Sequence, residues 1–175
     1  MYKRQVRKKT FSLAPFLSNK SSIQQGYLTS EPFLVEREAG FTPNIFLLAD
    51  FGYPSYGAMV LASSKVIKNN PEIVKAFVDA SIEGWRQYIY EDPSLGNELI
   101  MIENSEMKED ILLQAIKKIR NYELVSSENS KGLDIGSMTD AKWESFFKTM
   151  SSNGVYDESL SWRQAFTLDF INQEN

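Results

Sequence analysis

NIFLLADFGYPSYGAMVLA, residues 44–62, is the stretch that decides the predicted fold. Residues 44–49 and 58–62 are runs of almost only apolar side chains, and the segment between them holds glycine, proline and tyrosine. Each run is too short for a typical helix, and a short apolar run bounded by turn residues is typical of a strand buried on both faces. The stretch therefore predicts two buried strands joined by an aromatic loop.

On the N-terminal side, a strand followed at once by a helix is predicted. Residues 22–29 (SIQQGYLT) alternate mixed side chains in the manner of a short strand that reaches a functional edge. Ser30 can cap a helix, Pro32 suits its first turn and Gly40 suits its end, so residues 31–39 are expected to be helical.

On the C-terminal side, the pattern becomes helical. The strongest helix is expected from Pro71 onward, because Asn70 precedes it and apolar residues then recur at helical spacing. Asp92, Ser105 and Thr139 are predicted to begin three more helices, residues 126–136 a loop, and residues 167–172 a last short helix. The predicted fold class is therefore α/β, with short strands in the N-terminal third followed by mostly helices.

The composition favours a soluble, folded protein and disfavours several kinds of partner and chemistry. Of the 175 residues, 42% are hydrophobic and 24% charged, which is ordinary for a globular chain. The net charge of -4 gives no positive field for nucleic acid or anionic lipid. Because histidine and cysteine are absent, imidazole bases, imidazole ligands, thiolate metal sites and disulfides are excluded. The basic residues within 1–10 are followed by no apolar core or cleavage site, so no signal peptide is predicted.

Three blocks of sequence resemble one protein family. They are residues 24–32 (QQGYLTSEP), 48–57 (LADFGYPSYG) and 70–85 (NPEIVKAFVDASIEGW), with a later segment at 135–140 (IGSMTD) before Trp143. Together they resemble the substrate-binding proteins of ABC transporters, in the thiamine-pyrimidine and riboflavin branch of the type II periplasmic-binding-protein fold. The branch is similar to the sulfonate, taurine and nitrate binders.

The resemblance implies a C-terminal portion of a two-lobe fold. Residues 1–52 would complete the second lobe and the hinge crossover, and residues 53–175 would form the mostly helical C-terminal part of the first lobe. Strand edges and apolar faces would then lack their cover, so self-association with a second copy is expected. The resemblance also implies a permease partner in the membrane and a periplasmic or extracellular, membrane-associated location.

In the resembled family the ligand lies between the lobes, which directs attention to Tyr27, Thr29 and Glu31 at the predicted strand-to-helix junction. The Glu31 carboxylate could accept hydrogen bonds from an amine or ring N–H of a heterocycle, and it could equally serve as a first-turn acid that complements the helix dipole. Tyr27 could stack on a ligand ring or simply pack on its neighbours. The resemblance favours the ligand role for Glu31.

Three further candidates lie in the crossover loop: Asp50, Tyr53 and Tyr56. Glycines allow a backbone to approach a ligand closely, and loops can act as hinges. The same residues also fit simple turn chemistry. One or two of the three are predicted to bind ligand, and Glu31 is predicted to lie beside them at the mouth of a groove between two sheets.

The resulting hypothesis is a solute-binding component of an ABC importer for a small heteroaromatic metabolite, such as a thiamine-precursor pyrimidine or riboflavin. A sulfonate, taurine or nitrate binder is the alternative ligand class. A pyrimidine-synthase-like enzyme is the rival, but the related synthase uses its own histidine and a pyridoxal-phosphate lysine, and this chain has no histidine. No catalytic residue, metal or cofactor is therefore expected. A purely structural helical protein is the third possibility.

Overall fold

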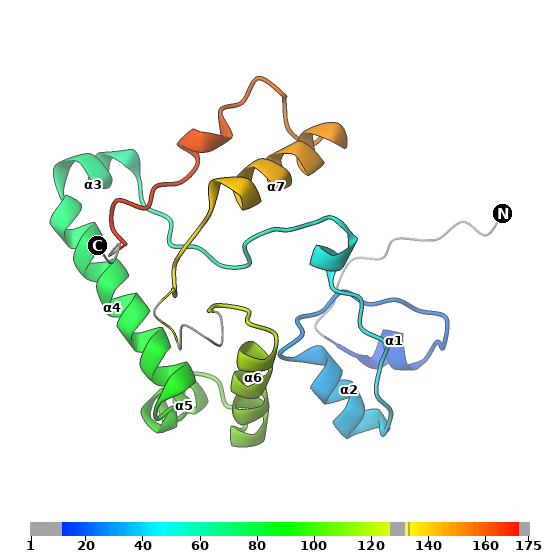
Figure 1. Ribbon diagram of the computed structural model, residues 1–175. Helices are drawn as coiled ribbons and strands as arrows, with labels where there is room; N and C mark the ends of the chain where they lie inside the picture. Colours follow the sequence, from blue (N-terminus) through cyan, green and yellow to red (C-terminus); the bar gives the residue numbers. More distant parts are fainter. Residues whose placement is uncertain (1–11, 127–131, 133, 172–175) are drawn as a thin grey trace.

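The structure is a computed structural model that describes residues 12–126, 132 and 134–171 (Figure 1). The described residues form α-helices and two short 3-10 helices joined by long irregular segments. In chain order these are α1 Ala14–Leu17, α2 Glu31–Ala39, η1 Leu48–Phe51, α3 Ser64–Asn69, α4 Pro71–Tyr90, α5 Ser94–Glu103, α6 Glu109–Asn121, α7 Asp140–Ser152 and η2 Trp162–Gln164.

The predicted α/β fold class is wrong for the described residues, among which no strand is present. The expected strand at 22–29 is irregular, the run at 44–49 ends in η1, and the run at 58–62 is irregular. A strand is stable only when another strand completes its hydrogen bonds. No described segment pairs with these runs, so their β propensity is not realised here, and the predicted groove between two sheets is absent from this part of the chain.

The long helix α4 confirms the prediction of a helix from Pro71. Proline at the first helical position has no N–H to leave unsatisfied and a backbone angle that suits a helix. The helix buries Val74 and Ile89, while Ile73 and Phe77 of the same predicted apolar face remain exposed. Much of its apolar surface is therefore not covered by described residues.

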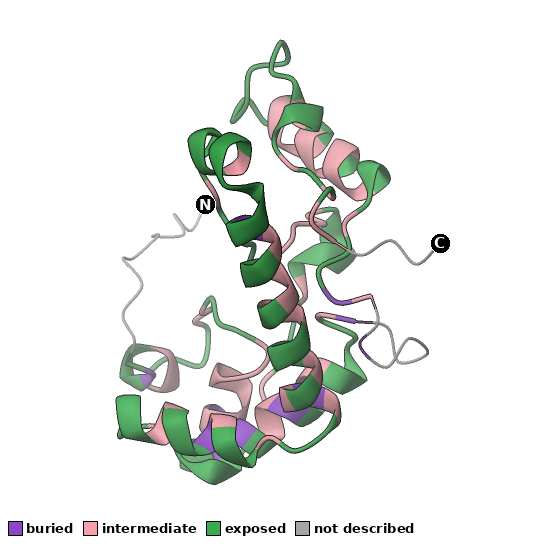
Figure 2. Cartoon of the chain, turned by 90° about the vertical axis from the view of Figure 1, so that its left-hand side faces the viewer, coloured by how far each residue is buried: buried purple, intermediate pink, exposed green. Residues whose placement is uncertain are grey.

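The largest group of buried residues lies where α4, α5 and α6 meet. Other buried residues, such as Val74 near the start of α4 and Ile135 before α7, lie apart from it, and the purple segments in Figure 2 are accordingly spread over several places. Ile89 is fully buried, and α6 contributes Ile111, Leu112 and Ile116. Tyr88 on α4 donates its hydroxyl hydrogen to Oδ1 of the buried Asn97 on α5, over 2.7 Å. This pairing satisfies a polar group that would otherwise be costly to bury.

The other predicted helices are confirmed in part. Thr139 caps α7 by accepting a hydrogen bond from the Lys142 N–H over 3.2 Å, as predicted. The cap predicted at Ser105 is wrong, because α6 begins at Glu109. Residues 167–171 are not helical, and η2 precedes them instead; residue 172 lies outside the described residues, as do residues 127–131 and 133 of the predicted loop.

Helix α5 begins at Ser94, close to its predicted start. The Asp92 carboxylate accepts hydrogen bonds from the Ser94 hydroxyl and from the Ser94 N–H. These bonds favour the charged carboxylate and lower the pKa of Asp92. Within the described part of the chain, no helix combines the length and the apolar character needed to cross a bilayer.

Candidate functional site

Glu31 is the first residue of α2, and its side chain folds back over the preceding turn. Its Oε2 accepts a hydrogen bond from the Tyr27 N–H over 2.7 Å. A side chain on Gly26 would obstruct this arrangement, because a Cβ there would lie 2.9 Å from Glu31 Cβ and Cδ. Gly26 therefore has a local structural role, because its missing side chain leaves room for the Glu31 carboxylate to bond the turn before α2.

Helix α6 contacts both the turn before α2 and α2 itself. The Gln114 side chain on α6 donates to the Thr29 carbonyl oxygen over 2.5 Å. Arg37 of α2 forms an ion pair with Asp110 of α6, with 3.4 Å between Nη1 and Oδ2. Thr29 therefore lies at the contact between α2 and α6 and holds it through its backbone, while the Tyr27 side chain is exposed.

The part of the predicted crossover that follows η1, residues 52–56, lies along α7, and from here on we call these residues the crossover loop. The Gly52 carbonyl accepts a hydrogen bond from the Thr149 hydroxyl over 3.2 Å, and the Tyr53 ring packs edge-on against Phe146 with centroids 5.4 Å apart. Tyr56 packs against Trp143, with centroids 5.8 Å apart. The loop thus contacts α7 in reverse order, and the two segments run antiparallel.

The spacing of these contacts has a simple geometric reason. Thr139, Trp143, Phe146 and Thr149 recur at intervals of three or four residues, so they share one face of the helix. Ten helical residues rise about 15 Å, and four extended residues cover about 13 Å. The extended loop of residues 52–56 is therefore long enough to contact α7 from Thr139 to Thr149.

Tyr56 takes part in a hydrogen bond, a ring contact and a cation–π contact, all with residues at the start of α7. Its hydroxyl oxygen accepts a hydrogen bond from the Thr139 N–H over 2.9 Å, at the start of α7. The Lys142 ammonium lies 4.2 Å from the centre of the Tyr56 ring, which is a favourable cation–π distance. The start of α7 therefore fixes both the hydroxyl and the ring of Tyr56.

Beyond Tyr56 the aromatic contacts continue into the C-terminal segment. Phe166 is parallel to Trp143 at 4.9 Å and to Trp162 at 6.5 Å between ring centroids. We call Tyr56, Trp143, Phe166 and Trp162 the aromatic stack. Trp143 Nε1 is buried and has no hydrogen-bond partner among the described residues. Sequence reasoning missed Phe166, because one phenylalanine in an unpatterned segment carries no periodicity that could identify it.

Asp50 lies in η1 and is exposed. Its carboxylate makes no hydrogen bond or ion pair with another described residue. Within the described chain, the predicted residues thus form two groups: Tyr27, Thr29 and Glu31 near α6, and Tyr53 and Tyr56 on α7. No hydrogen bond, ion pair or ring contact between described residues joins these groups.

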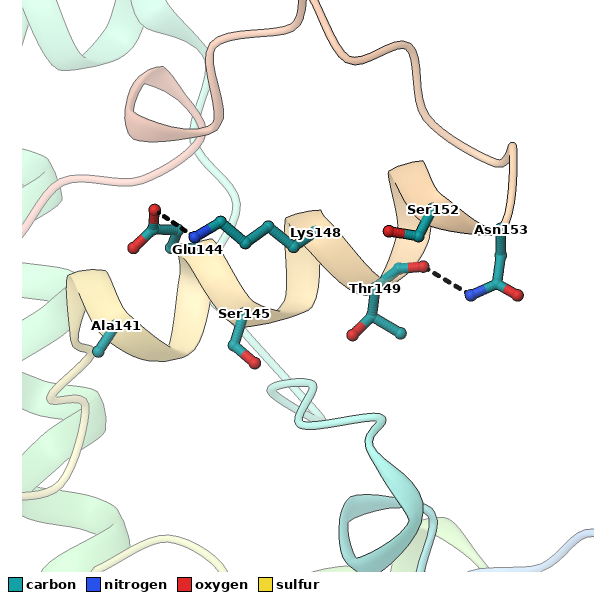
Figure 3. A pocket seen from close by; sticks show the side chains of 7 residues that line it. All are labelled: Ala141, Glu144, Ser145, Lys148, Thr149, Ser152 and Asn153. Atoms are coloured by element: carbon teal, nitrogen blue, oxygen red, sulfur yellow. Dashed lines mark hydrogen bonds and ion pairs between the residues drawn. The ribbon is translucent and has the colours of Figure 1, made fainter.

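A shallow hollow opens along the polar side of α7, as Figure 3 shows. Glu144 and Lys148 form an ion pair of 2.9 Å across it, and the Asn153 amide donates to the Thr149 carbonyl over 2.7 Å. Its lining is Ala141, Glu144, Ser145, Lys148, Thr149, Ser152 and Asn153. The hollow contains none of the six predicted residues and no aromatic side chain. The described residues also contain no cluster of three or more potential metal ligands.

Comparison with known proteins identifies the family of the chain. Residues 5–95 match the family described as NMT1/THI5 like. Over 160 aligned residues the chain is 26% identical to the riboflavin-binding protein RibY of Chloroflexus aurantiacus. The aligned region makes up 90% of this chain and 44% of that protein. The chain thus spans less than half the length of this curated relative. No solved structure matches the chain. The family match takes in more than half of the residues and confirms the resemblance drawn from the sequence blocks: the chain belongs to the NMT1/THI5-like family.

Proposed function

We propose that the chain is part of a solute-binding protein that binds a small heteroaromatic metabolite, of the riboflavin or thiamine-precursor pyrimidine type, for an ABC importer. The family match and the similarity to a riboflavin-binding protein support a binding role. Two lobes divided near residue 52, a permease partner and a periplasmic or extracellular location belong to the same proposal. They rest on the family resemblance.

The observation that carries the choice of ligand class is the aromatic crossover loop on α7. Tyr53 and Tyr56 are held by ring contacts at defined positions, and Lys142 places a positive charge against the Tyr56 ring. Aromatic side chains fixed in this way suit a planar ligand ring, because stacking needs a rigid and correctly oriented face. A sulfonate or nitrate ion has no aromatic face to match.

Binding is favoured over catalysis by the chemistry of the residues present. The 175 residues contain no histidine and no cysteine. The Glu31 carboxylate lies in the turn before α2 and the Asp50 carboxylate is exposed in η1, and no contact between described residues joins them into an acid–base pair. A binding site requires only shape, stacking and a few directed hydrogen bonds.

The test is a titration of riboflavin fluorescence with the full chain, repeated with the thiamine-precursor pyrimidine, taurine and nitrate as competitors. Stacking on an aromatic side chain should quench the flavin, and the pyrimidine should compete where the anions do not. Replacement Tyr56→Ala should weaken binding about two- to tenfold, since an aromatic contact is worth about 0.5–1.5 kcal/mol.

The matched control is Tyr122→Ala. Tyr122 also lies under a lysine, with Lys118 Nζ 5.5 Å from its ring centre, but it is exposed and outside the aromatic stack. The Tyr122→Ala variant should leave riboflavin binding unchanged. For the acid, Glu31→Gln is compared with Glu72→Gln, another first-turn acid. Equal effects within each pair, or no binding of any of the four compounds, would reject the proposal.

A further inference from the structure

The start of α7 is held by two segments that lie far apart in the sequence. From the crossover loop, the Tyr56 hydroxyl oxygen accepts a hydrogen bond from the Thr139 N–H, and the Tyr56 ring packs on Trp143. From the C-terminal segment, η2 lies beside the same part of α7 (Figure 1), and Phe166 packs on Trp143 as well. The Trp143 indole thus contacts rings from both segments.

The contact between Phe166 and Trp143 sets the orientation of the indole. The two rings are 5° from parallel and their centroids lie 4.9 Å apart, an offset-stacked arrangement that aromatic pairs prefer. Trp143 Nε1 is buried and makes no hydrogen bond with a described residue, so ring packing rather than a directed bond fixes the indole. Because the Tyr56 ring lies 5.8 Å from the indole between centroids, the position of Trp143 in turn limits that of Tyr56.

An ion pair also attaches the C-terminal segment to α7. Arg163 of η2 pairs with Asp140, the first residue of α7, and its guanidinium lies 4.6 Å from the centre of the Trp162 ring. The two charged side chains are 64% and 55% exposed, and an exposed ion pair contributes little to stability. The half-buried ring of Phe166 is therefore the stronger link between this segment and Tyr56.

We propose that Phe166 is a positioning residue for ligand binding, which acts through Trp143 and holds the Tyr56 ring in the orientation that stacks on the ligand. This role rests on the proposed function, in which Tyr56 contacts a planar heteroaromatic ligand. A ring that is held in place before binding loses less freedom when the ligand stacks on it, so the held ring binds more tightly. Phe166 acts in this way without touching the ligand.

The test is a double-mutant cycle on riboflavin affinity, measured by the fluorescence titration with the full chain. Phe166→Ala should weaken binding about two- to tenfold, the range expected for the loss of one aromatic contact. In the Tyr56→Ala background the same change should have no further effect, since the ring that Phe166 positions is gone. A merely structural role would weaken binding equally in both backgrounds.

Two further variants are the controls for this cycle. Phe166→Tyr keeps a flat ring and should bind riboflavin as the wild type does. Tyr156→Ala removes another C-terminal ring that packs on α7, with centroid distances of 6.2 Å to Phe146 and 6.4 Å to Phe147. Because Tyr156 has no ring contact with Trp143 or Tyr56, this variant should leave the affinity unchanged.

Hydrogen exchange at the Thr139 amide tests the positioning without any ligand. This N–H donates to the Tyr56 hydroxyl oxygen over 2.9 Å. Phe166→Ala should therefore speed its exchange about two- to tenfold, whereas Tyr156→Ala should not change it.

The outcomes separate this role from the proposed function. Unchanged exchange in Phe166→Ala, or an equal loss of affinity with and without Tyr56, would overturn the positioning role while riboflavin still binds. A wild type that binds none of the four compounds would overturn the proposed function and, with it, the ligand role of Phe166.

Discussion

Gly96 and Tyr88 show how closely α4 and α5 approach each other. A Cβ at Gly96 would lie 2.6 and 2.8 Å from two carbons of the Tyr88 ring, which is closer than real contacts allow. The missing side chain therefore lets the ring pass over α5 and reach Asn97. One glycine determines the geometry of a buried hydrogen bond.

We expect Gly96→Ala to lower the free energy of unfolding by about 1–3 kcal/mol, because overpacking forces the ring and the helix apart. The matched control is Gly84→Ala on α4, where a Cβ would meet no described atom within 4 Å. That variant should be more stable by about 0.5–1 kcal/mol, since alanine loses less backbone freedom in a helix. Urea unfolding measures both, and a neutral Gly96→Ala would show that the contact relaxes without cost.

Tyr88 also makes the stability depend on pH. Burial raises the pKa of Tyr88 above its ordinary value of 10.0. The folded state therefore holds the phenol proton more tightly than the unfolded state does. This contribution is complete below the unfolded pKa and is lost as pH rises through the folded pKa.

Accordingly, as the pH rises above the ordinary tyrosine pKa of 10.0, the free energy of unfolding should fall more steeply in the wild type than in Tyr88→Phe. At neutral pH the same variant should be less stable by about 1–2 kcal/mol, because the buried Asn97 loses its donor. Tyr122→Phe, at an exposed position, should retain both the stability and the pH slope of the wild type. Identical slopes in wild type and Tyr88→Phe would contradict the assignment.

At the scale of elements, the contact between the crossover loop and α7 holds two segments that are about 90 residues apart in the sequence. Phe146 is its central residue, because its ring packs on Tyr53 and also lies 6.2 Å from Tyr156 between centroids. No residue of α7 is fully buried. The helix is held mainly by half-buried aromatic contacts.

Phe146→Ala should therefore release the crossover loop and reduce the free energy of unfolding by about 1–2 kcal/mol, less than the 3–5 kcal/mol of a fully buried ring. Limited proteolysis should cleave within residues 52–56 faster than in the wild type. Phe77→Ala, which removes an exposed ring from α4, is the control and should leave the cleavage rate unchanged. Unaltered cleavage in Phe146→Ala would show that the loop is held elsewhere.

At the scale of the whole molecule, the core formed by the described residues is small. Buried apolar side chains gather where α4, α5 and α6 meet and occur singly elsewhere, while large side chains such as Phe46 and Leu61 remain exposed. Stability should therefore depend on what covers the exposed surface. A partner that binds only the folded state adds to stability by mass action.

The sequence by itself determined the family and the local starts of helices. Asn70-Pro71, Asp92 and Thr139 mark helix starts that the structure confirms closely, because a helix start depends on residues only a few positions apart. The tyrosines of the crossover loop were singled out from the sequence as candidate ligand-binding residues, through their place among turn residues, and that role stays a prediction. That α7 fixes these tyrosines could not be predicted, since the contact joins distant parts of the chain.

Only the tertiary structure decided whether the apolar runs at 44–49 and 58–62 become strands. Their composition favours a strand, but a strand exists only when a neighbour supplies its hydrogen bonds. That neighbour is not encoded in the run itself and is absent from the described residues. Likewise, the sequence indicated Glu31 as a site residue, but only the folded turn revealed its bond to the Tyr27 N–H. Local chemistry was predictable from the sequence, whereas strand pairing and side-chain partners depended on which distant segments the fold brings together.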